Sequence, residues 1–406
     1  MLNDNTSLVR SSFLSIRKEE DNAYKIAHVI SGRQFRVDHS TIEVLDYFKQ
    51  PQNLSDIECD DSFRLSLEQL VTGGLLVDVG KRMEETFQVQ NPEPAFFGFQ
   101  PYKAETDDQT QRIVMVGVPF GGGNSVSSKA SRFPYALRRF AQMRNLNLKP
   151  TAQVNYKSLG NGGHVHHLPQ LIQNAFVRDG GDAFIHHFEA SKQVYDKIRY
   201  IFQQIVRKQH IPFAIGGDHS ISLPVIQSVA EVHDNIHILH FDAHTDTYSS
   251  PYEPILDQAG SHHHGNFLSK CLRMEQVQKV THFGIRGLNN AFIQEESSKQ
   301  KIYWADELKN LLRSDETDFA LPDDQNYYLS FDIDVLDPSV APGTATPLPN
   351  GLSFEEVMLL FQKLKLHEKR IVGLDFVEVN VSRDVYDLTI GIATQIILNM
   401  LNSVKI

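Results

Sequence analysis

From residue 112 onward, short runs of apolar residues alternate with stretches of helical periodicity, and this alternation constrains the fold more than any other feature. The apolar runs are RIVMVGVP (112–119), IPFAIGGDH (211–219), NIHILHFDAHTD (235–246), KVTHFGIRG (279–287), YYLSFDIDVLD (327–337) and RIVGLDFVEVN (370–380). Runs that are apolar on both faces are typical of parallel strands covered by helices on both sides. We therefore expect an α/β fold over residues 111–406, with a parallel sheet between two helical layers.

The composition is that of an ordinary globular protein, and it disfavours several classes of function. Hydrophobic residues make up 41% and charged residues 22% of the 406 residues, so the length suggests two or three domains. The polar start MLNDNTSLVR does not resemble a signal peptide, and no apolar run is long enough to span a membrane. Only two cysteines are present, so we expect a reducing, cytoplasmic location. A net charge of −11 argues against nucleic-acid binding and mildly favours a cationic substrate.

Three regions are expected along the chain. Residues 1–90 are predicted to form a small first domain, residues 91–110 a linker and residues 111–406 the α/β domain. The segment NPEPAFFGFQPYKAETDDQTQ contains three prolines and a run of acids and amides, which is typical of a linker. We expect its aromatic residues to pack between the two domains; they are Phe96, Phe97 and Phe99.

Polar side chains gather where the apolar runs end, and ligands bind at this edge of a parallel sheet. Because side chains two residues apart share one face of a strand, HFDAHTD groups Asp242, His244 and, if the extended conformation continues, Asp246. The same spacing in SFDID groups Asp332 and Asp334. The sequence therefore predicts that two strands present carboxylates and an imidazole at one edge of the sheet.

These side chains have the composition of a metal site. The glycine pair in AIGGDHS allows a sharp turn that adds His219 to the set, which then holds both oxygen and nitrogen donors. Such donors suit a divalent ion such as Mn²⁺. Six ligands fit two ions about 3.5–4 Å apart with shared carboxylates and a bridging hydroxide. The alternative is that the acids cap helices or pair with lysines, but four clustered carboxylates without metal ions would repel one another strongly.

Four segments carry a family signature: GGDHS (216–220), DAHTD (242–246), SFDIDVLDPSVAPGT (330–344) and GLDFVEVN (373–380). In this order they resemble the ureohydrolase superfamily of arginases and agmatinases. The resemblance implies an arginase-like three-layer α/β/α fold and two Mn²⁺ ions per subunit. It also implies hydrolysis of a guanidino group to urea and an amine. By motif, one ion would be held by His219, Asp242, Asp246 and Asp332, and the other by Asp242, His244, Asp332 and Asp334.

The resemblance also implies roles in catalysis and substrate binding. Asp246 would orient the attacking hydroxide, and Glu378 would anchor a cationic substrate. His264 would pass a proton to the departing amine, with His263 as a reserve candidate. Tyr248 matches agmatinases at a position where arginases that act on free arginine carry asparagine. We therefore expect Tyr248, Glu378 and His264 to contact the substrate.

Two further histidine-rich segments lack nearby carboxylates in the sequence. They are GGHVHHLPQ (162–170) and IHH (185–187). We expect loop and surface positions for these histidines, with one of them a candidate for the substrate entrance.

The first 85 or so residues resemble a small winged-helix-like α+β module, specifically the PqqD-like element that recognises precursor peptides. Residues 13–30 and 32–38 have the alternation of strands, 39–50 and 62–72 that of helices, and a strand-like run follows a glycine pair. In that family the leader of the precursor adds as a strand beside the sheet. A helix with only Arg64 as a basic residue argues against DNA recognition. The alternative is an oligomerisation or regulatory module.

Together the two resemblances imply a peptide arginase, which converts arginine residues of a ribosomally made precursor peptide to ornithine. One alternative is an agmatinase-like enzyme for a small free guanidine, and another is free arginine held through Ser249 and Ser250. A deacetylase-like enzyme with one zinc and a non-catalytic scaffold fit the ligand set less well. The resemblance also suggests a homo-oligomer.

Overall fold

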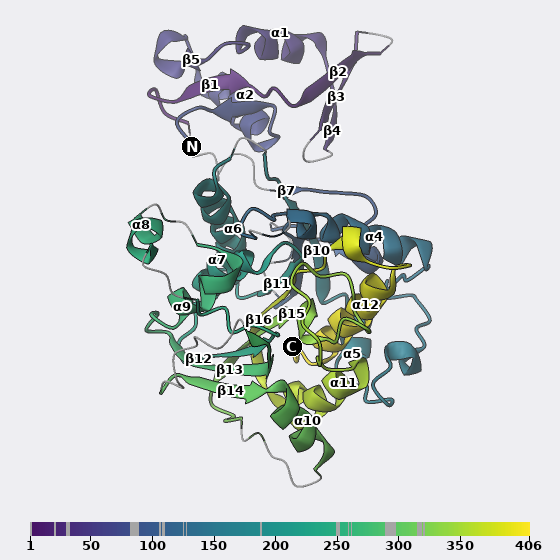
Figure 1. The fold of residues 1–406 in the computed structure, drawn as a ribbon. Helices are drawn as coiled ribbons and strands as arrows, with labels where there is room; N and C mark the ends of the chain where they lie inside the picture. Colours follow the sequence, from purple (N-terminus) through teal and green to yellow (C-terminus); the bar gives the residue numbers. More distant parts are fainter. Residues whose placement is uncertain are drawn as a thin grey trace. The chain divides into compact units, whose positions relative to one another are not determined.

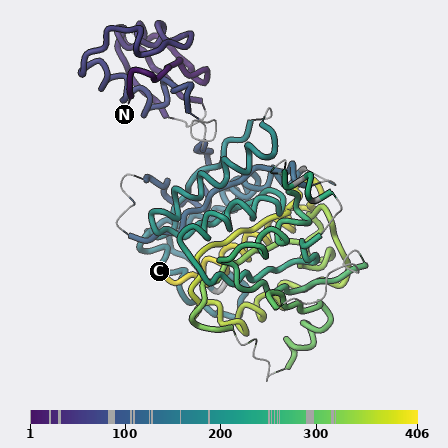
Figure 2. The backbone as a smooth tube through the Cα atoms, turned by 90° about the vertical axis from the view of Figure 1, so that its left-hand side faces the viewer, coloured from purple at the N-terminus to yellow at the C-terminus, as the bar shows by residue number. Residues whose placement is uncertain are grey.

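The structure is a computed structural model. It describes residues 2–406 except 20–21, 30–32, 82–88, 105–106, 108–109, 125, 127, 187–188, 249–251, 259, 261, 289–297, 315–318 and 320. The chain divides into two compact units, Met1–Pro92 and Glu93–Ile406, which Figures 1 and 2 trace from purple at the N-terminus to yellow at the C-terminus. In the part of the chain that the structure describes, no helix is long and apolar enough to cross a membrane.

The first unit combines two small antiparallel sheets with two helices. Its elements are β1 (Ser7–Arg10), β2 (Leu14–Lys18), β3 (Tyr24–His28), β4 (Gln34–Val37), α1 (His39–Tyr47), β5 (Gln52–Asn53), α2 (Asp61–Thr72), β6 (Leu76–Asp78) and β7 (Val89–Gln90). One sheet has the order β2-β3-β4 and the other the order β5-β1-β6. Asp38 and Asp60 cap the two helices, since their carboxylates accept the backbone N–H groups of Thr41 and Phe63.

The first unit has a core of its own. It contains Leu8, Ile26, Leu45, Phe48, Leu54, Leu67, Leu75 and Leu76. The expected strands and helices are present, but β1 was not predicted, because four residues are too few to show an alternating pattern. Its Leu8 is fully buried, so this short strand supplies part of the core.

The second unit is built on a parallel sheet with the neighbour order β14-β13-β12-β15-β16-β11-β9-β10, and β8 pairs with β10. The strands are β8 (Gln100–Pro101), β9 (Ile113–Gly117), β10 (Val177–Ala183), β11 (Ile211–Ile215), β12 (Ile236–Phe241), β13 (Val277–Ile285), β14 (Gln300–Trp304), β15 (Asn326–Asp332) and β16 (Arg370–Val377). The central strands are buried along nearly their whole length, as their continuous apolar runs predict.

Helices cover both faces of this sheet (Figure 1). On one face lie α6 (Ser191–Val206), α7 (Ser222–Val229) and α9 (Phe267–Cys271). On the other lie α4 (Phe133–Met143), α5 (Leu168–Gln173), α10 (Ala305–Arg313), α11 (Phe354–Lys363) and α12 (Leu388–Asn402). The short helix α8 (Glu253–Gln258) follows β12. The expected three-layer α/β/α architecture is confirmed.

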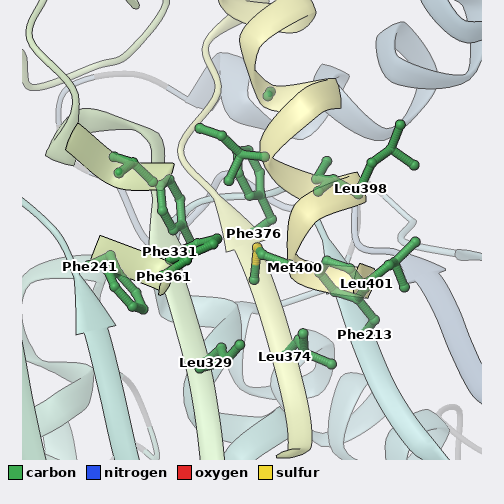
Figure 3. Close-up of a cluster of buried hydrophobic side chains, with 14 of the residues drawn as sticks. Phe213, Phe241, Leu329, Phe331, Phe361, Leu374, Phe376, Leu398, Met400 and Leu401 are labelled. Atoms are coloured by element: carbon green, nitrogen blue, oxygen red, sulfur yellow. The ribbon is translucent and has the colours of Figure 1, made fainter. Parts of the chain in front are cut away.

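The core on the α11 and α12 side is rich in aromatic side chains (Figure 3). Phe331 of β15 and Phe376 of β16 stack with ring centroids 5.2 Å apart, and Phe361 of α11 meets Phe241 of β12 edge to face. Met400 of α12 packs over the same strands. This dense layer gives the ends of the central strands a rigid base.

The prediction of a linker at residues 91–110 needs correction, because much of this segment belongs to the second unit. Phe96, Phe97 and Phe99 are buried in the core of that unit, so they do not serve as the domain seam that we expected. The guanidinium of Arg138 lies 3.4 Å from the ring centre of Phe96 and pairs with Asp179. The proline-rich segment is thus irregular in backbone but fixed by packing.

Candidate metal centre

Four adjacent strands bring the predicted site residues together. In the sheet, β12, β15, β16 and β11 follow one another as neighbours. Asp242 follows β12, Asp332 ends β15, Glu378 follows β16, and His219 lies just beyond β11. Because all four strands run parallel, their carboxyl ends meet at one edge. Residues more than 100 positions apart in sequence therefore share one small volume.

Sharp turns beyond the strands aim these side chains. Gly217 has a φ of +93°, and a Cβ there would lie 2.7 Å from the carbonyl oxygen of Val118, so only glycine fits. Asp246 has a φ of +49°, which is a left-handed conformation. The expectation that the strand continues to Asp246 is therefore wrong: β12 ends at Phe241, and the loop turns back to bring Asp246 to the site.

The first group of ligands surrounds the ring of His219. Its Nδ1 atom lies 3.0 Å from Oδ2 of Asp242, 3.0 Å from Oδ2 of Asp246 and 3.3 Å from Oδ2 of Asp332. All four side chains are buried. The predicted residues of one metal position are thus in contact in the structure.

The second group lies beside the first and shares Asp242. The Nδ1 atom of His244 is 3.4 Å from Oδ1 of Asp242 and 3.2 Å from Oδ2 of Asp334. Asp334 also accepts hydrogen bonds from the backbone of Ala243 and the hydroxyl of Thr346, which fix its orientation. The two oxygens of Asp242 face the two groups, as a bridging carboxylate requires.

The protein alone cannot keep all of these acids ionised at low cost. Burial raises the pKa of Asp332 well above its ordinary value, and repulsion from Asp334 and Asp242 adds to the increase. Burial also raises the pKa of Asp334. Burial opposes the charge of His219, but the surrounding carboxylates outweigh it and hold the pKa of His219 well above its ordinary value. Divalent cations would remove this repulsion.

The donor set fits such cations. In the described part of the chain, Nδ1 of His219 and Oδ2 of Asp242 are buried atoms without a hydrogen-bond partner, although they face each other. Buried polar atoms are rarely left in this state unless an ion or water satisfies them. His219, Asp242 and Asp246 form one group of potential ligands, and Asp242, His244 and Asp334 form the other. Mixed imidazole and carboxylate donors of this kind suit Mn²⁺.

A substrate-facing group lies next to the metal ligands. Oε1 of Glu378 lies 3.5 Å from Nδ1 of His264 and accepts the backbone N–H of His219 at 3.0 Å. Burial opposes protonation of His264, but Glu378 outweighs it and raises the pKa of His264 to about 9. An anionic anchor and a proton-bearing imidazole therefore stand side by side. This is the arrangement expected for binding a guanidinium and protonating an amine.

Sequence reasoning missed several supporting residues. Asn124 donates to both carboxylate oxygens of Glu378, at 3.3 and 3.0 Å. Ser330 lies 2.9 Å from Nε2 of His219 and donates to Asp375 at 2.9 Å. His240, two positions before Asp242, lies 3.0 Å from its Oδ2 atom. The period-two pattern places His240 on the face of Asp242, and this signal could have identified it.

The remaining predicted residues lie at the margin of the site or away from it. The backbone N–H of Tyr248 donates to the carbonyl of Gly265, and its side chain is exposed. His263 is half-buried beside Tyr248, with ring centroids 6.0 Å apart. Ser249 and Ser250, the alternative ligands for free arginine, lie outside the described residues, as does His187.

The histidine-rich segment at 162–170 is remote from these ligands in the fold. His166 stacks on His367, with ring centroids 3.6 Å apart, and the backbone N–H of His166 donates to Asn402 near the end of α12. Among the described residues, this cluster does not bring three metal-binding groups together. The expectation of loop positions for these histidines agrees with the structure.

The fold and the site define an α/β protein with a buried histidine–aspartate centre at the carboxyl edge of its sheet. A profile of the arginase family matches residues 111–402. The chain is 28% identical to the agmatinase of Proteus mirabilis over 306 residues, which cover 75% of this chain and 89% of that protein. It is 30% identical to the mitochondrial agmatinase of Gallus gallus over 309 residues, or 73% of this chain and 82% of that protein.

A structural comparison agrees. The proclavaminate amidino hydrolase of Streptomyces clavuligerus superimposes with a TM-score of 0.62 at 26% identity, over 77% of this chain and 97% of that one. The chain belongs to the arginase family. It is a hydrolase that acts on a carbon–nitrogen bond of a guanidino group, in a family that depends on a binuclear manganese centre.

Proposed function

We propose that this protein converts arginine residues of a ribosomally made precursor peptide to ornithine, with release of urea. The observation that supports a peptide substrate is the first unit. Met1–Pro92 has its own core and lies outside residues 111–402, which the family profile matches. A small free guanidine would need no such unit, whereas a unit that holds a precursor would raise the local concentration of its arginines.

The residues of the site can perform the hydrolysis. Water adds to the guanidinium carbon, the bond from that carbon to the side-chain nitrogen breaks, and the products are urea and the ornithine amine. Glu378 would pair with the guanidinium and hold its carbon over the metal ligands, and Asn124 fixes the carboxylate of Glu378. His264 would donate the proton that the departing amine requires, and its raised pKa keeps it protonated at neutral pH.

Two Mn²⁺ ions bound by the six ligands would lower the pKa of water and supply hydroxide at neutral pH. One position would be formed by His219, Asp242, Asp246 and Asp332, and the other by Asp242, His244, Asp332 and Asp334. Asp246 is also placed to accept a hydrogen bond from the attacking hydroxide.

The first unit would bind the leader of the precursor. Its β2-β3-β4 sheet has β2 and β4 as outer strands among the described residues, and an outer strand can accept an extended peptide. This assignment follows the resemblance to PqqD-like elements. Partner binding by this unit is a separate proposal from the hydrolysis at the metal centre.

The second candidate is an agmatinase-like enzyme for a small free guanidine. The names of the relatives support it, because two of those compared above are agmatinases. Tyr248 at the margin of the site matches agmatinases as well. In this case the first unit would have a structural role.

A competition experiment separates the two candidates. Full-length protein loaded with Mn²⁺ would receive agmatine, free arginine and a leader-bearing arginine peptide together, with urea assayed and peptide masses recorded. We expect the mass loss from arginine to ornithine in the peptide, and less urea from the same core peptide without its leader. Urea from agmatine alone would contradict the peptide substrate and leave the metal chemistry intact.

A further inference from the structure

Large apolar side chains stand exposed on the loops that follow the carboxyl ends of the strands. We name this set the apolar rim. Its members, with their exposed fractions, are Val126 (57%), Tyr248 (60%), Tyr252 (67%), Leu288 (90%), Val385 (50%) and Tyr386 (99%). They follow β9, β12, β13 and β16, so four separate loops at the edge of the metal centre contribute. Solvent-exposed apolar groups that recur at one edge mark an interaction site.

The backbone at Tyr386 shows that its exposure is built into the loop. Tyr386 and Asp387 are consecutive residues with left-handed φ values of +50° and +59°. Each such non-glycine residue is strained by about 1 kcal/mol or more. Asp384 holds the loop in place, because its carboxylate accepts the backbone N–H groups of Val385, Thr389 and Ile390. The loop therefore sustains strain and leaves an aromatic ring in solvent.

Hydrogen bonds connect the rim to the reacting centre. Arg383 donates to the carbonyl of Ala345 at 2.6 Å, and the hydroxyl of the adjacent Thr346 donates to the metal ligand Asp334. On the β9 loop, the N–H of Val126 donates to Asn124 at 2.8 Å, and Asn124 in turn holds Glu378. The rim residues are thus one or two contacts from the groups that bind metal and guanidinium.

We propose that the apolar rim binds apolar residues on either side of the reacting arginine in a polypeptide. This inference rests on the proposed function and specifies its substrate: an arginine with apolar neighbours. The acidic site takes the guanidinium, and the chain that continues on both sides of the arginine lies across the loops. A small guanidine such as agmatine enters the centre without reaching four separate loops.

A second copy of the protein is a poorer occupant. A subunit seated on all four loops would cover the carboxyl edge and block the approach to His264 and Glu378. A flexible peptide covers the same side chains only while its arginine is in the site. Aromatic rings suit this task, because they offer a large contact area at low cost in side-chain entropy.

The test uses two short peptides that each contain one arginine, flanked by leucines in one and by serines in the other. Binding to Mn²⁺-loaded full-length protein is measured by competition with a fluorescent peptide, and urea is assayed in parallel. We expect the leucine peptide to bind about tenfold more tightly, since each leucine buries apolar area on the rim. The variant Tyr386→Asn should reduce this preference several-fold, and Tyr386→Phe should retain it. Asparagine tolerates the left-handed backbone, so the loop should keep its shape.

Met143→Ser is the matched control, because Met143 is 63% exposed but lies at the far end of α4, away from the strand-end loops. Equal binding of the two peptides by the wild-type protein would overturn the inference and leave the proposed function standing. Preference without urea release from either peptide would support the rim and count against the proposed function. A change in molecular mass with Tyr386→Asn, in place of a change in preference, would make a second copy the occupant and overturn the inference.

Discussion

Two regions of the second unit gather histidines, and they differ in what surrounds the rings. At the carboxyl edge, His219 and His244 face carboxylates, and burial is outweighed so that the pKa of His244 rises to about 12. In the loop at 162–167, burial and the neighbouring histidines lower the pKa of His166, and the same two causes act on His367. One region holds positive charge, and the other excludes it.

The comparison shows that histidine density alone does not identify a metal site. In the sequence the motif GGHVHH looks as rich in ligands as HFDAHTD. Only the second motif ends a central strand beside other acid-bearing strand ends, and only there do three or more ligand atoms converge among the described residues. Carboxylates and position in the sheet decide the outcome.

The largest expected effect comes from removing a shared carboxylate. Asp332→Ala should abolish binding of at least one Mn²⁺ and lower urea release by roughly a thousandfold or more, because the remaining ligands cannot hold both ions. His367→Ala, in the other histidine cluster, is the control and should leave metal content unchanged. Elemental analysis with a urea assay measures both. Two ions per subunit in the Asp332→Ala protein would contradict the site assignment.

The next effect concerns the proton donor and should leave the metal in place. His264→Gln should lower kcat by about a hundredfold to ten-thousandfold, which is the usual contribution of a general acid. The Mn²⁺ content should match the wild type, because His264 lies beside Glu378 and outside the two ligand groups. His186→Gln, which changes a half-buried histidine outside the site, should leave kcat unaltered. Loss of metal from His264→Gln would show that His264 is a ligand.

The sequence predicted the sheet and all six proposed metal ligands, because strand ends and their spacing are local features. It did not predict how Asp246 reaches the site, since a left-handed turn breaks the period-two pattern. It also missed Asn124, whose loop contains no ionisable motif and which meets Glu378 across 254 positions of sequence. The packing of Phe96 on Arg138 was missed for the same reason. Contacts between distant segments leave no mark in a single sequence.

A smaller effect is expected from the support behind His219. Ser330→Ala removes the hydroxyl that links Nε2 of His219 to Asp375, and this should lower Mn²⁺ affinity by about tenfold to a hundredfold. Thr281→Val is the matched control, since the Thr281 hydroxyl lies 2.8 Å from Nε2 of His237, a buried histidine that binds no metal in our assignment. Metal titration should distinguish the two. Equal affinity in Ser330→Ala and the wild type would make Ser330 a packing residue only.

The smallest effect concerns pH and the other histidine cluster. Burial and neighbouring histidines lower the pKa of His166 and His367 in the folded protein, so folding favours their neutral forms. Their contribution to stability is therefore complete above the unfolded pKa of about 6.5 and is lost as the pH falls below it. Because both rings are partly exposed, the loss should not exceed about 1 kcal/mol in the free energy of unfolding. His166→Phe keeps a flat ring on His367 and should flatten the decline between pH 7 and 5 in denaturant titrations, whereas the exposed control His39→Asn should not. An unchanged pH dependence in His166→Phe would show that the stacked pair does not sense protons.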